Sequence, residues 1–202
     1  MGTTPTLHLA LDAPADALLS RDAFALLVGM LLDQQVPMER AFAGPYTIAE
    51  RLGTPDRLDP RVVAETDPDA FAKVMAGPPA VHRFPGSMGT RVQALAVAIV
   101  QQYDGDAAAL WTTASSGDEL LRRLQGLPGY GEQKARIFVA LLGKQLGVRP
   151  DGWREASGPF GAEGSYISVA DIVDDDSLGK VRSYKQQLKA AAKDGARDEV
   201  SS

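Results

Sequence analysis

Residues 127–135 read LPGYGEQKA, a glycine-rich segment between two apolar runs. Two glycines, Gly129 and Gly131, flank a single tyrosine, so the backbone there can adopt positive φ and leave its amides uncovered by side chains. The leucines before this stretch recur at helical spacing, and their helix is predicted to end at Gly126 and Pro128. A second helical run of apolar residues follows directly (Ile137, Phe138, Leu141 and Leu142). The sequence therefore predicts two helices joined by a short hairpin.

The predicted hairpin places backbone N–H groups at the N-terminus of the second helix. The first amides of a helix have no intrahelical partner, and the helix dipole is positive at this end. Such a terminus is a binding site for an anion. Because amides rather than side chains do the binding, the site holds a phosphate without reading a base.

The composition limits the classes of protein that need to be considered. A chain of 202 residues with 45% hydrophobic side chains forms one domain, or two small lobes around a cleft. Few segments alternate as strands do, so we expect mostly helix. The formal charge of -5 means that a nucleic-acid partner must be held by a local basic face.

The absence of cysteine excludes disulfides, thiolate nucleophiles and cysteine-ligated zinc or iron–sulfur sites. His8 and His82 are the two histidines, which excludes a histidine-rich metal cluster and leaves only carboxylate sites open. The first ten residues contain no Lys or Arg, and the apolar run over residues 23–32 is too short to span a bilayer. We therefore expect a soluble cytoplasmic protein.

The first long apolar run predicts a buried helix over residues 21–40. Its apolar character ends abruptly at Asp33, Gln34 and Gln35, just before Pro37. Two interpretations are open for this polar tip. Either the amides cap the end of the helix, or the tip faces a cleft and contacts a ligand.

The loop over residues 77–89 is rich in Pro and Gly and is long for a compact domain, which is typical of functional loops. His82 beside Arg83 is more typical of a surface pair than of a catalyst. Arg91 is expected in the first turn of the next helix, where it opposes the dipole unless an anion lies nearby. After Gly147 the periodicity weakens. Short helices are predicted over residues 168–176 and 177–193, the second of them basic.

The hairpin stretch resembles the helix–hairpin–helix element of the HhH-GPD superfamily of base-excision DNA glycosylases, the relatives of endonuclease III. The matching positions are Leu127, Pro128, Gly129, Gly131 and Ala135. Counting forward without a gap from the hairpin, the catalytic aspartate of that family falls on Asp151. Residues 30–35 resemble the end of the family's early helix, and the loop before Arg91 resembles its second DNA-contacting loop. The resemblance covers about residues 22–151.

The sequence also departs from this family. Many members hold an iron–sulfur cluster on four cysteines, which this chain lacks. The lysine of the bifunctional members falls on Gln133, while Lys134 takes the place of a small hydroxyl residue. One step along a helix turns a side chain by about 100°. We therefore expect no Schiff-base lyase activity, and we expect Lys134 to contact a phosphate. The surroundings of Asp151, residues 150–153, also depart from the family pattern.

The resemblance implies a role for each matching residue. Asp151 would stabilise positive charge on the sugar and activate water, although an aspartate between Pro and Gly is also typical of a turn. The backbone of Gly129, Tyr130 and Gly131 would hold a phosphate, directly or through a bound monovalent cation. Gln35 would fill the gap left by a flipped base or read the opposite base, unless it caps the helix.

Further residues complete the expected site. Ser87 and Met88 would lie on the other side of the gap. Phe42, Tyr46 and Trp153 are candidate walls for the flipped base, and the alternative for each is a place in the core. A local basic face is expected from five side chains around the hairpin (Lys134, Arg136, Lys144, Arg149 and Arg154).

Together these observations predict an all-α fold, a single HhH-GPD-like unit over residues 1–202. Its central helical lobe would cover about residues 36–135. The second lobe would combine residues 1–35 and 136–202, with the cleft between them. The predicted function is that of a monofunctional DNA glycosylase without a cofactor, a monomer acting on uracil or an alkylated purine in double-stranded DNA. The alternatives are a non-catalytic helix–hairpin–helix DNA-binding protein and a helical protein unrelated to DNA.

Overall fold

A computed structural model describes residues 6–200, with side chains described up to residue 192. These residues form helices and no strand, and one isolated parallel bridge joins Ser116 to Asp151. The predicted all-α class is therefore confirmed. The α-helices are α1 (Ala13–Arg21), α2 (Ala23–Leu32), α3 (Met38–Arg51), α4 (Pro60–Glu65), α5 (Pro68–Ala76), α6 (Pro85–Tyr103), α7 (Ala109–Thr112), α8 (Gly117–Gln125), α9 (Glu132–Gln145), α10 (Trp153–Ala156) and α11 (Asp175–Val200), with 3-10 helices η1 (Gly158–Gly161) and η2 (Val169–Asp171).

The single helix predicted over residues 21–40 is wrong, because the chain there forms parts of three helices. Asp22 begins α2: its carboxylate accepts a hydrogen bond from the Ala25 amide at 2.9 Å. Past α2 the chain turns at Gln35, which has a φ of 56°, and α3 begins after Pro37. Nine of the ten residues of α2 are buried, so it is the central helix of its half, as its apolar sequence indicates.

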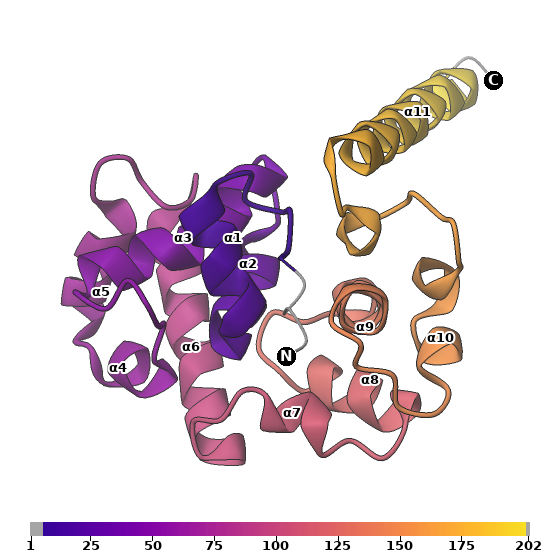
Figure 1. The fold of residues 1–202 in the computed structure, drawn as a ribbon. Coiled ribbons are helices and arrows are strands. Elements are labelled where there is room, and N and C mark those ends of the chain that lie inside the picture. Colours follow the sequence, from indigo (N-terminus) through magenta and orange to yellow (C-terminus); the bar gives the residue numbers. More distant parts are fainter. Residues whose placement is uncertain (1–5, 201–202) are drawn as a thin grey trace.

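Helices α1 to α6 pack on one another, with α2 and α6 at their centre, and α7 to α10 pack around α9 (Figure 1). The division predicted from the sequence differs from this one: residues 13–32 pack with α3 and α6 rather than with the C-terminal segments. The physical reason is the uniformly apolar surface of α2, which is covered by the helices that follow it in sequence.

The two groups of helices meet where the hairpin before α9 lies against α2. The Tyr130 hydroxyl donates to the Leu27 carbonyl at 2.7 Å, and the Tyr130 ring is edge-on to Phe138. Gly129 approaches α2 so closely that an added Cβ would lie 2.3 Å from Leu31 Cδ1. The hairpin is therefore fixed against the C-terminal half of α2.

The C-terminal part of the chain differs from the two short helices predicted for it. Only η2 forms within residues 168–174, and α11 then runs as one helix that projects away from the remaining helices (Figure 1). Leu178 and Val181 anchor its first turns in the core. None of the helices in the described part of the chain is both long and apolar enough to cross a membrane.

Candidate nucleic-acid interface

The hairpin between α8 and α9 is a tight turn with open amides. The Tyr130 amide donates to the Leu127 carbonyl at 3.2 Å, and Gly129 has a φ of 81°. A Pro-Gly pair at the centre of such a turn is the arrangement that a type II turn requires. Gly131 caps α9 with a φ of -70°, and no side chain accepts from the first amides of the helix. Those amides belong to exposed residues at the positive end of the helix dipole.

Tyr130 contributes to this site through its backbone alone. Its side chain is 3% exposed and its hydroxyl is bonded to α2, so the ring serves the core. Gly129 and Gly131 are exposed, as are Glu132 and Gln133 in the first turn of α9. A phosphate approaching the hairpin would therefore meet backbone amides, as the sequence predicts.

Polar side chains from three further segments converge beside the hairpin, at the end of α2. Lys134 Nζ and Gln34 Nε2 both donate to the Leu31 carbonyl at 3.0 Å. Arg91 Nη1 lies 3.5 Å from Gln34 Oε1, and so joins the first part of α6 to this group. The end of α2, the start of α6 and the start of α9 thus form one surface.

His82 supports this surface from beneath. Its side chain is 1% exposed, and its Nδ1 accepts from the Phe84 amide at 3.0 Å. Nε2 therefore carries the proton, and it donates to the Gln34 carbonyl at 2.9 Å. His82 fixes the turn at Gln34 and is neither a surface pair with Arg83 nor a group exposed for catalysis.

The charges on this surface influence one another. Burial lowers the pKa of Lys134 to about 8, with Asp33 opposing the shift and Arg91 adding to it. Burial raises the pKa of Asp33, while Lys185 and then Lys134 oppose that shift. Asp33 is thus a carboxylate with cations from α9 and α11 close by.

A pocket of about 290 Å³ opens between the turn after α2 and α11. Asp33 lies on its wall, and Lys185 and Lys189 line the opposite side. Arg182 donates to Glu39 at 3.1 Å and ties α11 to α3 at the edge of the pocket. The apolar part of the lining comes from both sides (Val36, Pro37, Met38, Ile172, Leu178 and Val181).

Several residues predicted for the site lie together on this surface. Gln35 is exposed in the turn after α2, and its positive φ sets it apart from the residues of the helix. Ser87 and Arg91 are exposed in the first two turns of α6. Met88, by contrast, is 3% exposed beneath Gln34, whose Nε2 lies 3.5 Å from Met88 Sδ. Met88 is therefore part of the packing rather than a contact for DNA.

Asp151, the predicted catalytic residue, lies elsewhere. Its carbonyl accepts from the Gly117 amide at 2.7 Å, at the start of α8. The hairpin follows the other end of α8, nine residues later, so about 13 Å of helix separates the two places. The Asp151 side chain is exposed at the end of α9 that is remote from the hairpin.

The three predicted base-stacking residues do not form a wall together. Phe42 is fully buried, and a Cβ on Gly29 would lie 2.8 Å from its ring, so it is a core residue between α2 and α3. Trp153 is 8% exposed and packs directly over Gly143, near Asp151. Tyr46 is half-buried within α3. The presence of a large aromatic side chain in the sequence does not distinguish a core residue from one that lines a pocket.

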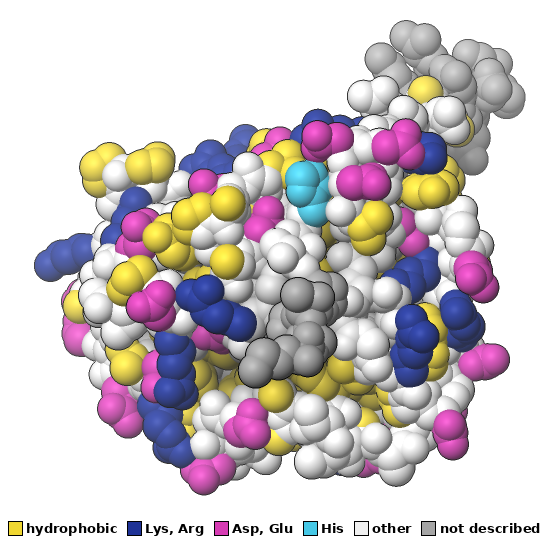
Figure 2. Space-filling model, in the orientation of Figure 1, with side chains coloured by type: hydrophobic (Ala, Val, Ile, Leu, Met, Phe, Trp, Pro, Cys, Tyr) yellow, Lys and Arg dark blue, Asp and Glu magenta, His cyan; other side chains and the backbone are white. Residues whose placement is uncertain are grey.

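Most of the basic side chains expected around the hairpin have structural partners. Arg136 pairs with Glu132, Lys144 pairs with Asp171 at 2.5 Å, and Arg149 donates to the Gly143 carbonyl. Arg154 stacks on Trp153. Of the five, Lys134 lies beside the hairpin as predicted, and Arg91 acts on it; Lys185 acts on Asp33. On the face of the molecule drawn in Figure 2, Lys and Arg are interspersed with Asp and Glu, in keeping with a footprint smaller than a whole face.

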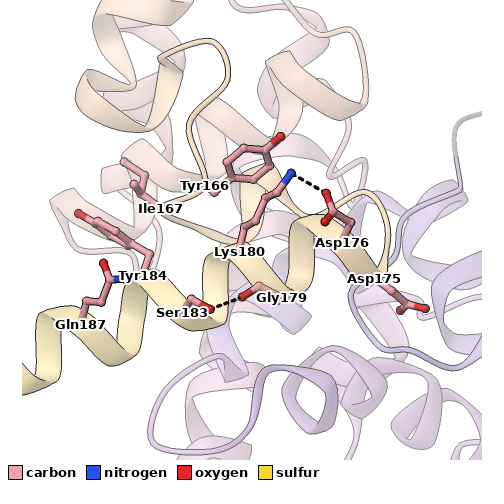
Figure 3. Close-up of a pocket in the computed structure, with 9 residues that line it drawn as sticks. All are labelled: Tyr166, Ile167, Asp175, Asp176, Gly179, Lys180, Ser183, Tyr184 and Gln187. Carbon is pink, nitrogen blue, oxygen red and sulfur yellow. Dashed lines mark hydrogen bonds and ion pairs between the residues drawn. The ribbon is translucent and has the colours of Figure 1, made fainter.

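Another pocket lies along the opposite side of α11 (Figure 3). Lys180 reaches across it to lie 4.6 Å from the centre of the Tyr166 ring, and its Nζ is 2.5 Å from Asp176. The charge of Lys180 is already balanced by Asp176, so the pocket presents no open site for an anion. Among the described residues, no group of three or more His, Asp or Glu is placed to hold a metal ion.

Three members of this surface have no specific role predicted from the sequence: Lys185, Asp33 and Gln34. The polar tip after the apolar run was a usable signal for the last two. Lys185 lies on α11, where no resemblance extended. Comparison of the chain with family models, with curated proteins and with solved structures found no match.

Proposed function

We propose that this protein binds the backbone of double-stranded DNA through the hairpin of residues 127–131 and the first turn of α9. The observation that carries the proposal is the set of open, uncapped amides at Gly131 and after it. Lys134 and Arg91 add positive charge beside these amides. Binding of this kind contacts phosphates and is independent of sequence.

A charge placed at the hairpin tests this proposal. Gln133→Glu adds a carboxylate in the first turn of α9, where the helix dipole tolerates it, so the fold should be unaffected. A unit charge about 4 Å from a phosphate costs about 1 kcal/mol in water. We expect about five-fold weaker binding of a fluorescent duplex, measured by anisotropy.

The matched control is Gln102→Glu, the same change at an exposed position near the other end of α6. Its affinity should equal that of the unchanged protein. Binding should also weaken steeply as salt is raised. Absence of binding at low salt, or equal effects of the two variants, contradicts the proposal.

Base excision is the second candidate function. It follows from the HhH-GPD resemblance and is favoured by one observation: a partly exposed carboxylate, Asp33, lies beside the proposed phosphate site. The position of Asp151 favours the non-catalytic alternative instead. A panel of duplexes, each with one uracil or one alkylated purine, separates the two. Strand breaks that need alkali would indicate base release without lyase activity, and no breaks would support a binding protein.

A further inference from the structure

Asp33 is placed where a carboxylate does not stabilise its own helix. It follows the last turn of α2, at the negative end of the helix dipole, where an acidic side chain is unfavourable. The end of the helix is closed by its backbone, since the Asp33 amide donates to the Gly29 carbonyl at 3.1 Å. No hydrogen-bond donor to the carboxylate oxygens is found among the described residues. Capping and hydrogen bonding therefore leave the side chain unexplained.

The setting of Asp33 is also costly for a protein that binds phosphate. Lys134 and Lys185 lie close enough to influence its ionisation, and Arg91 acts in turn on Lys134. These cations would attract a DNA backbone, while the nearby carboxylate of Asp33 repels it. A positive charge that develops on the sugar of a bound nucleotide during a reaction would instead be attracted by this carboxylate.

Asp33 is also accessible from a cavity. It lies on the wall of the pocket between the turn after α2 and α11, with apolar neighbours Val36 and Met38. Partial burial strengthens the interaction of a carboxylate with a nearby positive charge. Gln35, two residues further along the chain, is exposed on the same turn and has a φ of 56°.

We infer that Asp33, and not Asp151, is the carboxylate that acts on the sugar of a flipped nucleotide, an inference that rests on the base-excision function proposed above. The bond between the base and C1′ breaks, and its electron pair leaves with the base. The carboxylate stabilises the positive charge that develops on the sugar. A water molecule adds to C1′, its proton passes to Asp33, and the proton then goes to the released base. The balance is one water consumed, with one free base and one abasic sugar formed.

A pair of synthetic abasic duplexes tests this inference without knowledge of the lesion. One carries a pyrrolidine, whose protonated ring nitrogen imitates the charged sugar. The other carries a neutral tetrahydrofuran. A site complementary to the charged state binds its analogue more tightly. We expect the unchanged protein to prefer the pyrrolidine duplex by about ten-fold or more, and Asp33→Asn to lose this preference.

Two variants control for the fold and for charge in general. Asp151→Asn removes the same charge at the far end of α8 and α9 and should keep the full preference. Asp33→Glu keeps the charge and should keep part of it. Asp33→Asn should also bind an undamaged duplex at least as tightly as the unchanged protein, because a repulsive charge has been removed. That second measurement reports that the variant is folded.

The outcomes distinguish a failure of the inference about Asp33 from a failure of the proposed base-excision function. A preference that survives Asp33→Asn overturns the inference, and if Asp151→Asn abolishes that preference, base excision stands with Asp151 as its carboxylate. An unchanged protein that binds both abasic duplexes equally overturns both the inference and base excision. Binding of undamaged DNA through the hairpin would survive that result.

Discussion

The two ends of the α8–α9 pair are built in opposite ways. At the far end, the Asp151 carbonyl is bonded to Gly117 and Trp153 fills the space over Gly143, so backbone and side chains lock the segments together. At the hairpin end, the first amides of α9 are uncapped and Asp33 has no hydrogen-bond donor among the described residues. The far end uses its polar groups for structure, whereas the hairpin end leaves the first amides of α9 and the Asp33 carboxylate without a hydrogen-bond partner among the described residues.

Two aspartates, one at each end, therefore have different surroundings. Asp151 takes part in the structure through its backbone, and its side chain faces solvent. Asp33 lies among cations, in a pocket, at an unfavourable helix end. We therefore expect substitutions at the far end to change the free energy of unfolding. Substitutions at the hairpin end should change DNA binding or base release.

The largest expected effect is on stability at the far end. Trp153→Ala should lower the free energy of unfolding by about 3–5 kcal/mol, because it empties the space over Gly143. Denaturant titration measures this loss. At a temperature where the variant stays folded, its affinity for an undamaged duplex should be unchanged. Weaker DNA binding by folded Trp153→Ala would break the comparison.

The next effect is on base release from a susceptible duplex. Asp33→Asn should slow single-turnover release about 100-fold, the scale of a catalytic group lost from the reaction. Asp151→Asn should stay within about two-fold of the unchanged protein, since no catalytic contact is lost. Alkali-induced strand breaks measure both rates. If Asp151→Asn slows release about 100-fold and Asp33→Asn does not, the catalytic carboxylate lies at the far end.

Substitution of the two hairpin glycines tests the backbone geometry of the hairpin end. Gly129→Ala should cost about 2 kcal/mol in unfolding free energy, because its φ is 81° and its new Cβ would meet Leu31. Gly131→Ala should cost no more than about 0.5 kcal/mol, as its φ is -70° and its Cβ would meet nothing within 4 Å. Thermal or denaturant unfolding gives both values. Equal losses would mean that the turn does not have this geometry.

The smallest effect concerns Lys134 and pH. Burial holds the pKa of its folded state at about 8, below the usual value near 10.5. The unfolded chain therefore binds this proton more tightly, and stability rises with pH through this range and is lost as pH falls through about 8. From pH 8.5 to 9.5 the unfolding free energy should rise by about 1 kcal/mol more in the unchanged protein than in Lys134→Met. Parallel pH profiles would contradict the shifted pKa.

Local pattern was sufficient for the hairpin and the two helices that it joins. The leucine spacing and the Pro-Gly turn at residues 127–131 gave two helices and a tight bend, since both depend on neighbours in sequence. The long helix over residues 21–40 was wrong because an apolar run does not reveal a break. The break at Asp22 arises from capping bonds, one of them to the distant Leu58 amide.

The site was harder to predict because its residues come from segments that are distant in sequence. Asp33, Arg91, Lys134 and Lys185 are distant in sequence, and only the packing of α2, α6, α9 and α11 brings them near one another. Counting forward from the hairpin gave Asp151, since counting ignores where the chain turns after α9. Phe42 and Trp153 were ambiguous because a buried ring in the core and one lining a pocket have the same local sequence signal.

Hydrogen–deuterium exchange with and without duplex DNA tests the central claim most directly, because it compares both ends in one experiment. We expect slower exchange over residues 127–134 and 33–35 when the duplex is bound, with no change over residues 149–153. Protection confined to residues 149–153, or no protection at the hairpin in a protein that binds DNA, would contradict it.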